Sequence, residues 1–166
     1  RVPVFIHGAP GIGKSDAVRQ IGAETGRKVF DLRLSLLSPV DLRGVPYCDA
    51  VLGITRWLPP MFLPNPGIQE DVRAILFLDE FNMASQAVQA AAYQLVLDRK
   101  LGEYVLPAGV DIIAAGNRAE DHAIVNNMSS ALRTRFLHIS AEPDLIEWKT
   151  WAASEGRPPA ARAAEP

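Results

Sequence analysis

The feature that most constrains this chain is a glycine-rich stretch at residues 8–15, which reads GAPGIGKS and matches the pattern G-x-x-x-x-G-K-S/T. Glycines let the backbone turn tightly and bring its N–H groups to phosphates, the lysine reaches the β- and γ-phosphates, and the serine hydroxyl binds Mg²⁺. An apolar run at 2–6 precedes the stretch, and an apolar helical face at 16–25 follows it. The stretch therefore lies between a predicted strand and a predicted helix, whose positive N-terminal end favours anions. We predict that ATP binds here through Gly8, Ala9, Pro10, Gly11, Ile12, Gly13, Lys14, Ser15 and Asp16.

The rest of the chain alternates apolar runs with helical patterns, which is typical of a mostly parallel α/β sheet. Ser85 can cap a helix that carries an apolar face, and a shorter helix is expected near Ser130. The Pro- and Gly-rich stretch 38–66 and the short stretch 101–106 predict β-hairpin insertions. The fold class we expect is therefore a five-stranded, mostly parallel sheet flanked by helices. Its strands are predicted at residues 2–6, 28–34, 74–78, 110–115 and 137–139.

Two acids, Asp79 and Glu80, directly follow the apolar run 74–78. Ligands of open α/β sheets bind at the carboxyl ends of the strands, so both acids are expected at the binding crevice. Asp79 would hold Mg²⁺ together with Ser15, directly or through water, and Glu80 would orient and deprotonate the attacking water. Alone, two acids after a strand suggest only a solvated strand end, but the phosphate loop favours the catalytic interpretation. A glutamate at this point also argues against a small GTPase, which uses glutamine.

Further polar residues follow the later strands. Asn117 comes after the run 110–115 and could hydrogen-bond the attacking water or the γ-phosphate, or it could simply be a turn asparagine. Arg133 and Arg135 stand two residues apart, beside apolar anchors. An arginine supplied across a subunit boundary can stabilise the transferring phosphoryl group. A surface salt bridge is the alternative for either arginine.

Charge and cysteine content exclude several classes of protein. The chain has 17 basic and 19 acidic residues, a formal net charge of −2, and thus lacks the excess of positive charge typical of a nucleic-acid partner. No apolar run approaches the roughly 18 residues of a membrane span, so we expect no membrane partner. The only cysteine, Cys48, excludes an internal disulfide. We expect Cys48 to be a buried or half-buried thiol in a reducing, cytoplasmic protein.

Taken in order, these motifs resemble the AAA+ ATPases, and within them the MoxR-like branch with its phage and plasmid members. The resemblance extends to about Trp151. It implies a P-loop NTPase fold with Asn117 as the sensor-1 residue, Arg135 as the arginine finger and Arg133 as the alternative finger. The stretches that resemble this branch are DLRG at 41–44, WLPP at 57–60, LDRKLGEY at 97–104 and AAGNR at 114–118, with Asp121 after it.

The resemblance also assigns the two hairpins. It implies that 38–66 holds a helix-2 insert and 101–106 a pre-sensor hairpin, which in such ATPases line the central face of a ring and touch client proteins. Trp57 and Tyr104 would then be aromatic handles for a client, since aromatic residues contribute much of the contact energy at interfaces. The alternative is that these rings pack onto the core, and it applies more readily to Trp57 than to Tyr104.

For function, the resemblance implies an ATP-binding and ATP-hydrolysing subunit. Members of the branch work as hexameric remodelling or chaperone-like machines, often beside partners that carry a von Willebrand A-type domain. Three other interpretations stay open: a nucleotide-gated interaction module with little turnover, a small-molecule P-loop kinase, and a nucleic-acid-directed or restriction-type motor. The intact acid pair argues against the first, the lack of an arginine-rich lid against the second, and the charge balance against the third.

Departures from the branch pattern concern subunit contacts and the lid. Many relatives carry arginine after the asparagine that follows the acid pair, whereas Asn82 is followed here by Met83. No helical lid with its sensor-2 arginine is predicted after Trp151, and the segment that normally precedes the first strand is missing. We therefore expect an AAA+ core at 1–151 and, at 152–166, a tail or truncated linker toward a missing lid.

Overall fold

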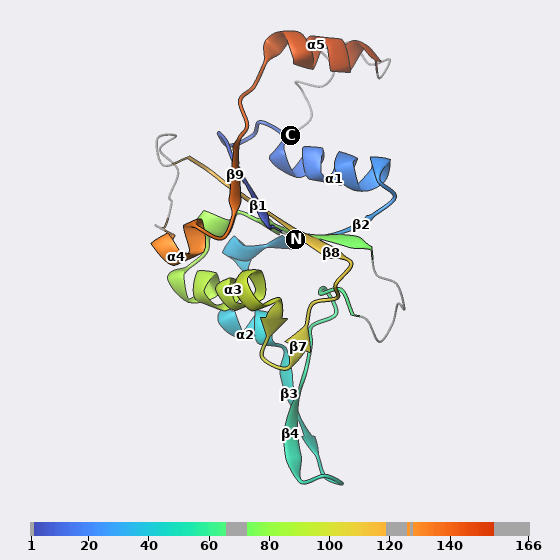
Figure 1. The fold of residues 1–166 in the computed structure, drawn as a ribbon, viewed down its shortest axis with the longest axis vertical. Helices are drawn as coiled ribbons and strands as arrows, with labels where there is room; N and C mark the ends of the chain where they lie inside the picture. Colours follow the sequence, from blue (N-terminus) through green and yellow to red (C-terminus); the bar gives the residue numbers. More distant parts are fainter. Residues whose placement is uncertain (1, 66–72, 119–125, 127, 155–166) are drawn as a thin grey trace.

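The computed structural model of the chain describes residues 2–65, 73–118, 126 and 128–154. Its core is a five-stranded sheet with the strand order β2-β5-β8-β1-β9, in which every neighbouring pair is parallel (Figure 1). The predicted fold class is confirmed. The five strands are β1 Val4–His7, β2 Lys28–Arg33, β5 Ala74–Asp79, β8 Val110–Gly116 and β9 Leu137–Ser140.

The interior strand β5 is apolar on both sides, and it is buried along its whole length because helices cover both faces of the sheet. On one face, Ile75 and Phe77 pack with Val18 of α1. On the other, Leu76 and Leu78 lie in the larger core cluster that includes the buried side of α3. Figure 1 shows α1 on one face and α2 and α3 on the other. The helices are α1 Lys14–Glu24, α2 Pro39–Arg43, α3 Gln86–Asp98, α4 Ser130–Arg133 and α5 Leu145–Ser154, with the 3-10 turns η1 Leu34–Leu36 and η2 Phe81–Met83.

Local sequence determines where two of these helices begin. The Ser85 side chain accepts a hydrogen bond from Val88 N at 3.4 Å, which confirms the predicted cap of α3. At α2, Ser38 and Asp41 form a capping box, in which Ser38 N donates to Asp41 Oδ2 at 2.7 Å. Such caps satisfy backbone N–H groups that a helix start leaves without intrahelical partners. At the other end of the chain, α5 runs across residue 151, and the division of the chain at that residue stays a prediction.

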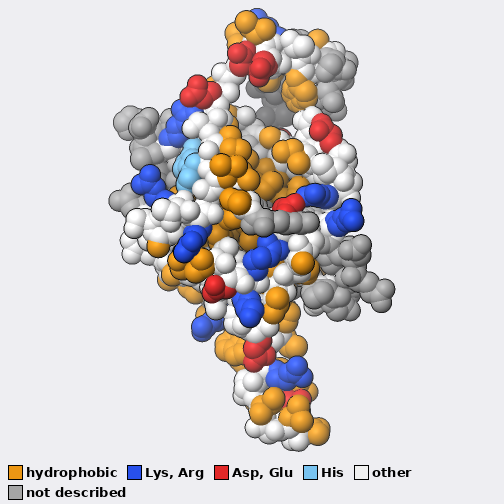
Figure 2. All heavy atoms as spheres, in the orientation of Figure 1, with side chains coloured by type: hydrophobic (Ala, Val, Ile, Leu, Met, Phe, Trp, Pro, Cys, Tyr) orange, Lys and Arg blue, Asp and Glu red, His pale blue; other side chains and the backbone are white. Residues whose placement is uncertain are grey.

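Two antiparallel hairpins extend from the sheet, as predicted. They pair β3 Val45–Asp49 with β4 Ile54–Leu58, and β6 Lys100–Leu101 with β7 Tyr104–Val105. The first hairpin projects from the body of the molecule (Figure 1), and Figure 2 shows apolar side chains along it. The exposed large apolar residues of this hairpin are Val45, Tyr47, Val51, Leu52, Ile54, Trp57 and Leu58.

Two expectations for the hairpins are wrong. Tyr104 is only 9% exposed and belongs to the core, because the short second hairpin lies against α3, and its hydroxyl donates to the Pro64 carbonyl. Of the two aromatic rings, Trp57 is the exposed one at 36%, and the Arg43 guanidinium lies 6.0 Å from its ring centroid. Cys48 is exposed rather than buried, because β3 and β4 form a two-stranded ribbon of exposed residues.

None of the helices within the described ranges combines the length and the apolar character that a membrane span needs.

Candidate active site

The glycine-rich stretch forms the turn between β1 and α1. Gly11 and Gly13 have φ angles of 76° and 87°, in the left-handed region that disfavours residues with a Cβ. Gly8 is favoured for a different reason, since a Cβ there would displace Ile12 Cδ1, at 2.4 Å, and crowd the Ala141 carbonyl oxygen, at 3.0 Å. The spacing of glycines in the motif therefore matches the path of this turn.

Lys14 joins the turn to the end of β8. Its ammonium donates to the carbonyl oxygens of Gly8 at 2.9 Å and Ala9 at 2.8 Å, and to Asn117 Oδ1 at 3.1 Å. The parallel pairing of β1 with β8 sets His7 opposite Gly116, immediately before Asn117. The structure thus brings together two predicted site residues that stand 103 positions apart.

Ser15 and Asp79 form a second junction, between α1 and the carboxyl end of β5. The Ser15 hydroxyl donates to Asp79 Oδ2 at 2.6 Å, and Asp79 is only 6% exposed. Its other oxygen, Oδ1, accepts from Glu80 N at 2.8 Å. Hydroxyl and carboxylate oxygens are hard ligands that suit Mg²⁺, which typically takes its remaining ligands from water and substrate phosphates. In the described part of the chain, no group of three or more His, Cys, Asp or Glu side chains could hold a metal ion by itself.

Glu80 follows Asp79 in a left-handed backbone conformation, with φ 54° and ψ 35°. Its partly buried side chain accepts a hydrogen bond through Oε2 from the Ser35 hydroxyl. Ser35 lies in η1, directly after β2, and the parallel register sets Arg33 of β2 opposite Asp79. The ends of two neighbouring strands thus bring Ser35 to the second acid.

Asn117 is held by a residue of the turn that follows the acid pair. The side-chain amide of Asn82 donates to Asn117 O at 2.6 Å and accepts from Asn117 N at 3.1 Å. With its backbone fixed in this way, Asn117 meets Lys14 through Oδ1. The four predicted elements of the site, namely the loop, the lysine, the acid pair and Asn117, therefore form one continuous set of contacts.

Two histidines and the backbone carbonyl of Arg133 form a chain of hydrogen bonds that starts at His7, the last residue before the glycine-rich loop. His7 Nε2 lies 2.7 Å from His138 Nδ1, and His138 Nε2 lies 2.7 Å from the carbonyl of Arg133. Because a carbonyl only accepts, a neutral His138 donates to Arg133 and accepts from His7. Burial lowers the pKa of His7, and the electrostatic influence of His138, Arg133 and Arg118 lowers it further. Among the described residues, Arg133 contributes its backbone carbonyl to this chain of contacts, and the side chains of both Arg133 and Arg135 are exposed without a hydrogen bond or ion pair.

The remaining predicted residues are less informative. The Asp16 carboxylate is exposed and forms an ion pair with Arg19 at 2.8 Å, so the loop has only its backbone N–H to offer a ligand at this position. Asp121 lies outside the described residues. Sequence reasoning missed Ser35 and His138, which belong to no motif, and gave Asn82 no role in the site. For Asn82 a signal existed, since it stands two residues after the acid pair.

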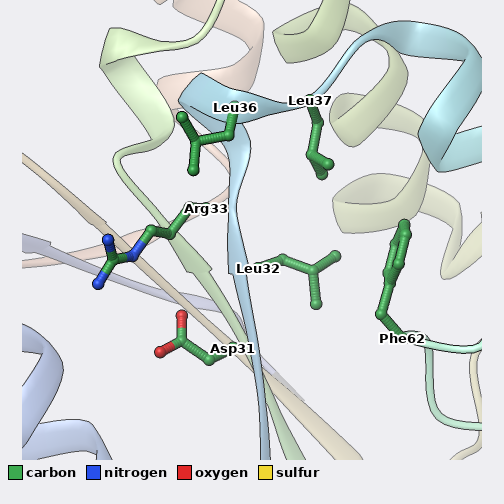
Figure 3. A pocket seen from close by; sticks show the side chains of 6 residues that line it. All are labelled: Asp31, Leu32, Arg33, Leu36, Leu37 and Phe62. Carbon is green, nitrogen blue, oxygen red and sulfur yellow. The ribbon is translucent and has the colours of Figure 1, made fainter.

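A separate pocket of about 340 Å³ lies beside β2 and η1 (Figure 3). It shares no residue with the glycine-rich loop or the acid pair, so it is not part of the candidate active site. Its lining residues are Asp31, Leu32, Arg33, Leu36, Leu37 and Phe62.

Comparison with known proteins agrees with this geometry. A family model described as AAA domain (dynein-related subfamily) matches residues 3–136. A protein from Cytophaga hutchinsonii assigned as an ATPase superposes with a TM-score of 0.65 at 18% identity, over 93% of this chain and 46% of that one. The Holliday junction branch migration motor RuvB of Thermotoga maritima superposes with a TM-score of 0.59 at 20% identity, over 93% of this chain and 44% of that one. At these identities the likeness concerns the fold, and the chain spans less than half of either solved chain. No curated protein matches this sequence.

Proposed function

Because the chain belongs to the AAA domain family of the dynein-related subfamily, we propose that it is the ATP-binding and ATP-hydrolysing subunit of an oligomeric remodelling machine of the MoxR-like branch. The observation that carries this proposal is the 2.6 Å contact between Ser15 Oγ and Asp79 Oδ2, which joins two motifs 64 positions apart. A phosphate-binding loop and an acidic Mg²⁺ ligand at one point are what phosphoryl transfer from a nucleotide requires.

The loop and Lys14 would hold the β- and γ-phosphates. Backbone N–H groups of the turn can point at phosphate oxygens, and the Lys14 ammonium would exchange some of its present acceptors, Gly8 O, Ala9 O and Asn117 Oδ1, for them. These acceptors are neutral, and bonds to a charged phosphate are stronger. Ser15 and Asp79 would hold Mg²⁺, which supplies positive charge to the phosphate oxygens when it is bound.

Glu80 is the proposed general base. Its carboxylate lies one residue beyond the Mg²⁺ ligand Asp79 and is oriented by the Ser35 hydroxyl. There it would take a proton from the attacking water while the water oxygen bonds to the γ-phosphorus. Asn117 would hydrogen-bond the water or the γ-phosphate from the end of β8, next to Lys14.

Arg135 would complete the site of a neighbouring subunit. Its side chain is exposed and makes no hydrogen bond or ion pair with the described residues, so it is available to a neighbour; the positive charge of Arg133 instead lowers the pKa of His7 in its own chain. We propose a homo-oligomeric, hexameric ring in a cytoplasmic setting, with the exposed first hairpin facing clients and a von Willebrand A-domain protein as a candidate partner.

Phosphate release tests the proposal directly. The chain with ATP and Mg²⁺ should release phosphate, and Glu80→Gln should reduce turnover by about 10²- to 10⁴-fold, the usual contribution of a general base. Lys14→Ala should weaken ATP binding by roughly 10- to 150-fold, since a hydrogen bond to a charged group is worth about 1.5–3 kcal/mol. The matched controls are Glu24→Gln and Lys28→Ala, which change exposed residues away from the site.

Three outcomes would redirect the assignment. Wild-type turnover by Glu80→Gln would remove Glu80 as the base, and tight ATP binding with no turnover by the wild type would favour a nucleotide-gated interaction module. Stimulation of phosphate release by added DNA or RNA would favour a nucleic-acid-directed motor over a protein remodeller.

A further inference from the structure

Asn82 is a buried polar residue whose side chain, among the described residues, hydrogen-bonds only Asn117. It is 4% exposed and lies in η2, directly after the acid pair. Both halves of its amide bond the backbone of Asn117, 35 positions away, through Nδ2 to the carbonyl at 2.6 Å and through Oδ1 to the N–H at 3.1 Å. A buried amide that is satisfied in this way fixes the orientation of the peptide groups it contacts.

The surroundings of Asn82 are shaped to keep this contact. A Cβ on Gly116 would lie 2.4 Å from Asn82 Oδ1, so a glycine is required before Asn117. The backbone oxygen of Asn82 accepts from Asn126 N at 2.7 Å, and Asn126 Nδ2 donates to Ala84 O at 2.9 Å. The turn that carries Asn82 is therefore held on both sides of its contact with Asn117.

The contact determines where the Asn117 side chain lies. With its backbone held by Asn82, Asn117 presents Oδ1 to Lys14 Nζ at 3.1 Å and Nδ2 to Met83 Sδ at 3.2 Å. Met83 belongs to the same turn as Asn82, and this turn begins directly after Glu80. A displacement of the turn would therefore move Glu80 and Asn117 together.

We propose that Asn82 is a positioning residue that holds Asn117 in register with Lys14 and Glu80, so that the polar end of β8 and the acid pair act as one unit. This inference rests on the proposed function, because it assumes that Asn117 recognises the γ-phosphate or the attacking water. Asn82 itself touches neither the nucleotide nor the reacting atoms; its effect passes through Asn117.

The test compares amide-to-acid changes at two buried amides. Asn82→Asp keeps the acceptor for Asn117 N–H but sets a carboxylate oxygen against the Asn117 carbonyl. Gln89→Glu is the control for a charge buried beside the same turn: Gln89 is 5% exposed, and its amide donates at 3.1 Å to Ala84 O, the carbonyl that Asn126 also bonds, but not to Asn117. Affinities for ATP and ADP are measured in a Glu80→Gln background, where ATP persists, and turnover is measured in chains with Glu80 intact.

We expect Asn82→Asp to lower the ratio of ATP to ADP affinity, and turnover, by at least about tenfold, the lower end of the loss typical of one hydrogen bond to a charged group. Asn117→Ala should give a similar loss. Adding Asn82→Asp to Asn117→Ala should then cost less than about twofold more, because residues that act through one another are not additive. Gln89→Glu should leave the affinity ratio unchanged.

Several results would overturn the inference. One is a wild-type ratio of ATP to ADP affinity in Asn82→Asp. Another is a further loss in the double variant as large as that of Asn82→Asp alone, and the third is a loss in Gln89→Glu equal to that in Asn82→Asp. If Asn82→Asp does not fold, as judged by its melting transition, Asn82→Ala avoids the buried charge and should show the same loss and the same non-additivity. A wild-type chain that binds ATP without releasing phosphate would overturn the proposed hydrolysis but not this inference, since the affinity ratio needs no turnover.

Discussion

At the scale of single residues, Glu80 combines its proposed chemical role with an unfavourable backbone conformation. Its φ of 54° lies in the left-handed region, which costs a residue with a Cβ about 1–2 kcal/mol. We expect Glu80→Gly to have a free energy of unfolding about 1 kcal/mol higher than Glu80→Ala. Both variants lose the bond to Ser35, so the comparison isolates the backbone. Urea unfolding measures the difference, and equal stability of the two variants would show that the conformation stores no strain.

The contact between His7 and His138 makes stability depend on pH. Because burial and neighbouring positive charges lower the pKa of His7, the folded chain resists protonation there. Below the ordinary histidine value of about 6.5, the unfolded chain takes up a proton that the folded chain does not, so stability is full above this pH and falls below it. The fall ends once the pH passes beneath the lowered pKa.

We therefore expect His7→Asn to lose less stability than the wild type between about pH 7.5 and about pH 5.5. Melting temperatures of both chains at the two pH values give the comparison, and the other two histidines are common to both chains. An identical pH dependence in His7→Asn would show that His7 does not contribute to it.

At the scale of elements, the two hairpins differ in what holds them. The second hairpin is anchored by Tyr104, whose burial raises the pKa of its hydroxyl and keeps it a donor to Pro64. Tyr104→Ala should lower the free energy of unfolding by about 3–5 kcal/mol, the usual cost of truncating a buried aromatic. Tyr104→Phe should cost about 1 kcal/mol, for one lost hydrogen bond.

Trp57 on the first hairpin provides the contrast, because it is exposed and the ribbon around it is exposed too. Trp57→Ala should cost less than about 1 kcal/mol, as is usual for changes at the surface. Chemical denaturation of the three variants ranks them. A loss in Trp57→Ala as large as that in Tyr104→Ala would mean that the projecting hairpin is held to the body through Trp57.

At the scale of the whole molecule, the position of Arg135 predicts how subunits cooperate. If it acts on a neighbour's nucleotide, Arg135→Ala should bind ATP normally but lose turnover in the assembly by about 10³- to 10⁵-fold, the contribution of an arginine finger. Mixing Arg135→Ala with Glu80→Gln should restore part of the activity, because some interfaces then pair an intact Arg135 with an intact Glu80. Phosphate release from rings shown to contain both chains is the measurement.

The control for this experiment is Arg133→Ala. The positive charge of Arg133 lowers the pKa of His7 in the same chain, so Arg133→Ala should affect the stability of its own subunit more than catalysis by a neighbour. No recovery on mixing would argue against a finger supplied between subunits, and a larger loss of turnover in Arg133→Ala would make Arg133 the finger instead.

Much of the site could be predicted because each motif is local and stands at the end of a strand. The loop, Asp79 and Asn117 each follow an apolar run, and a parallel sheet brings the ends of such runs to one edge. Ser35 and Asn82 could not be assigned in this way, since their partners depend on which strands are neighbours. The burial of Tyr104 could not be predicted either, because strands of two residues have no alternation to show which side α3 covers.

The strand order also has a consequence for how the chain is made. β1 is synthesised well before its partners β8 and β9, which set Val4 opposite Ile113 and Leu137. At the usual speed of translation, of about 5–20 residues per second, roughly ten seconds separate the synthesis of β1 from that of β8 and β9. During that time the phosphate loop has no sheet to hold it in shape. The nascent chain therefore acquires its nucleotide site only when almost all of the described sequence has emerged, and incomplete chains released by the ribosome should not retain ATP.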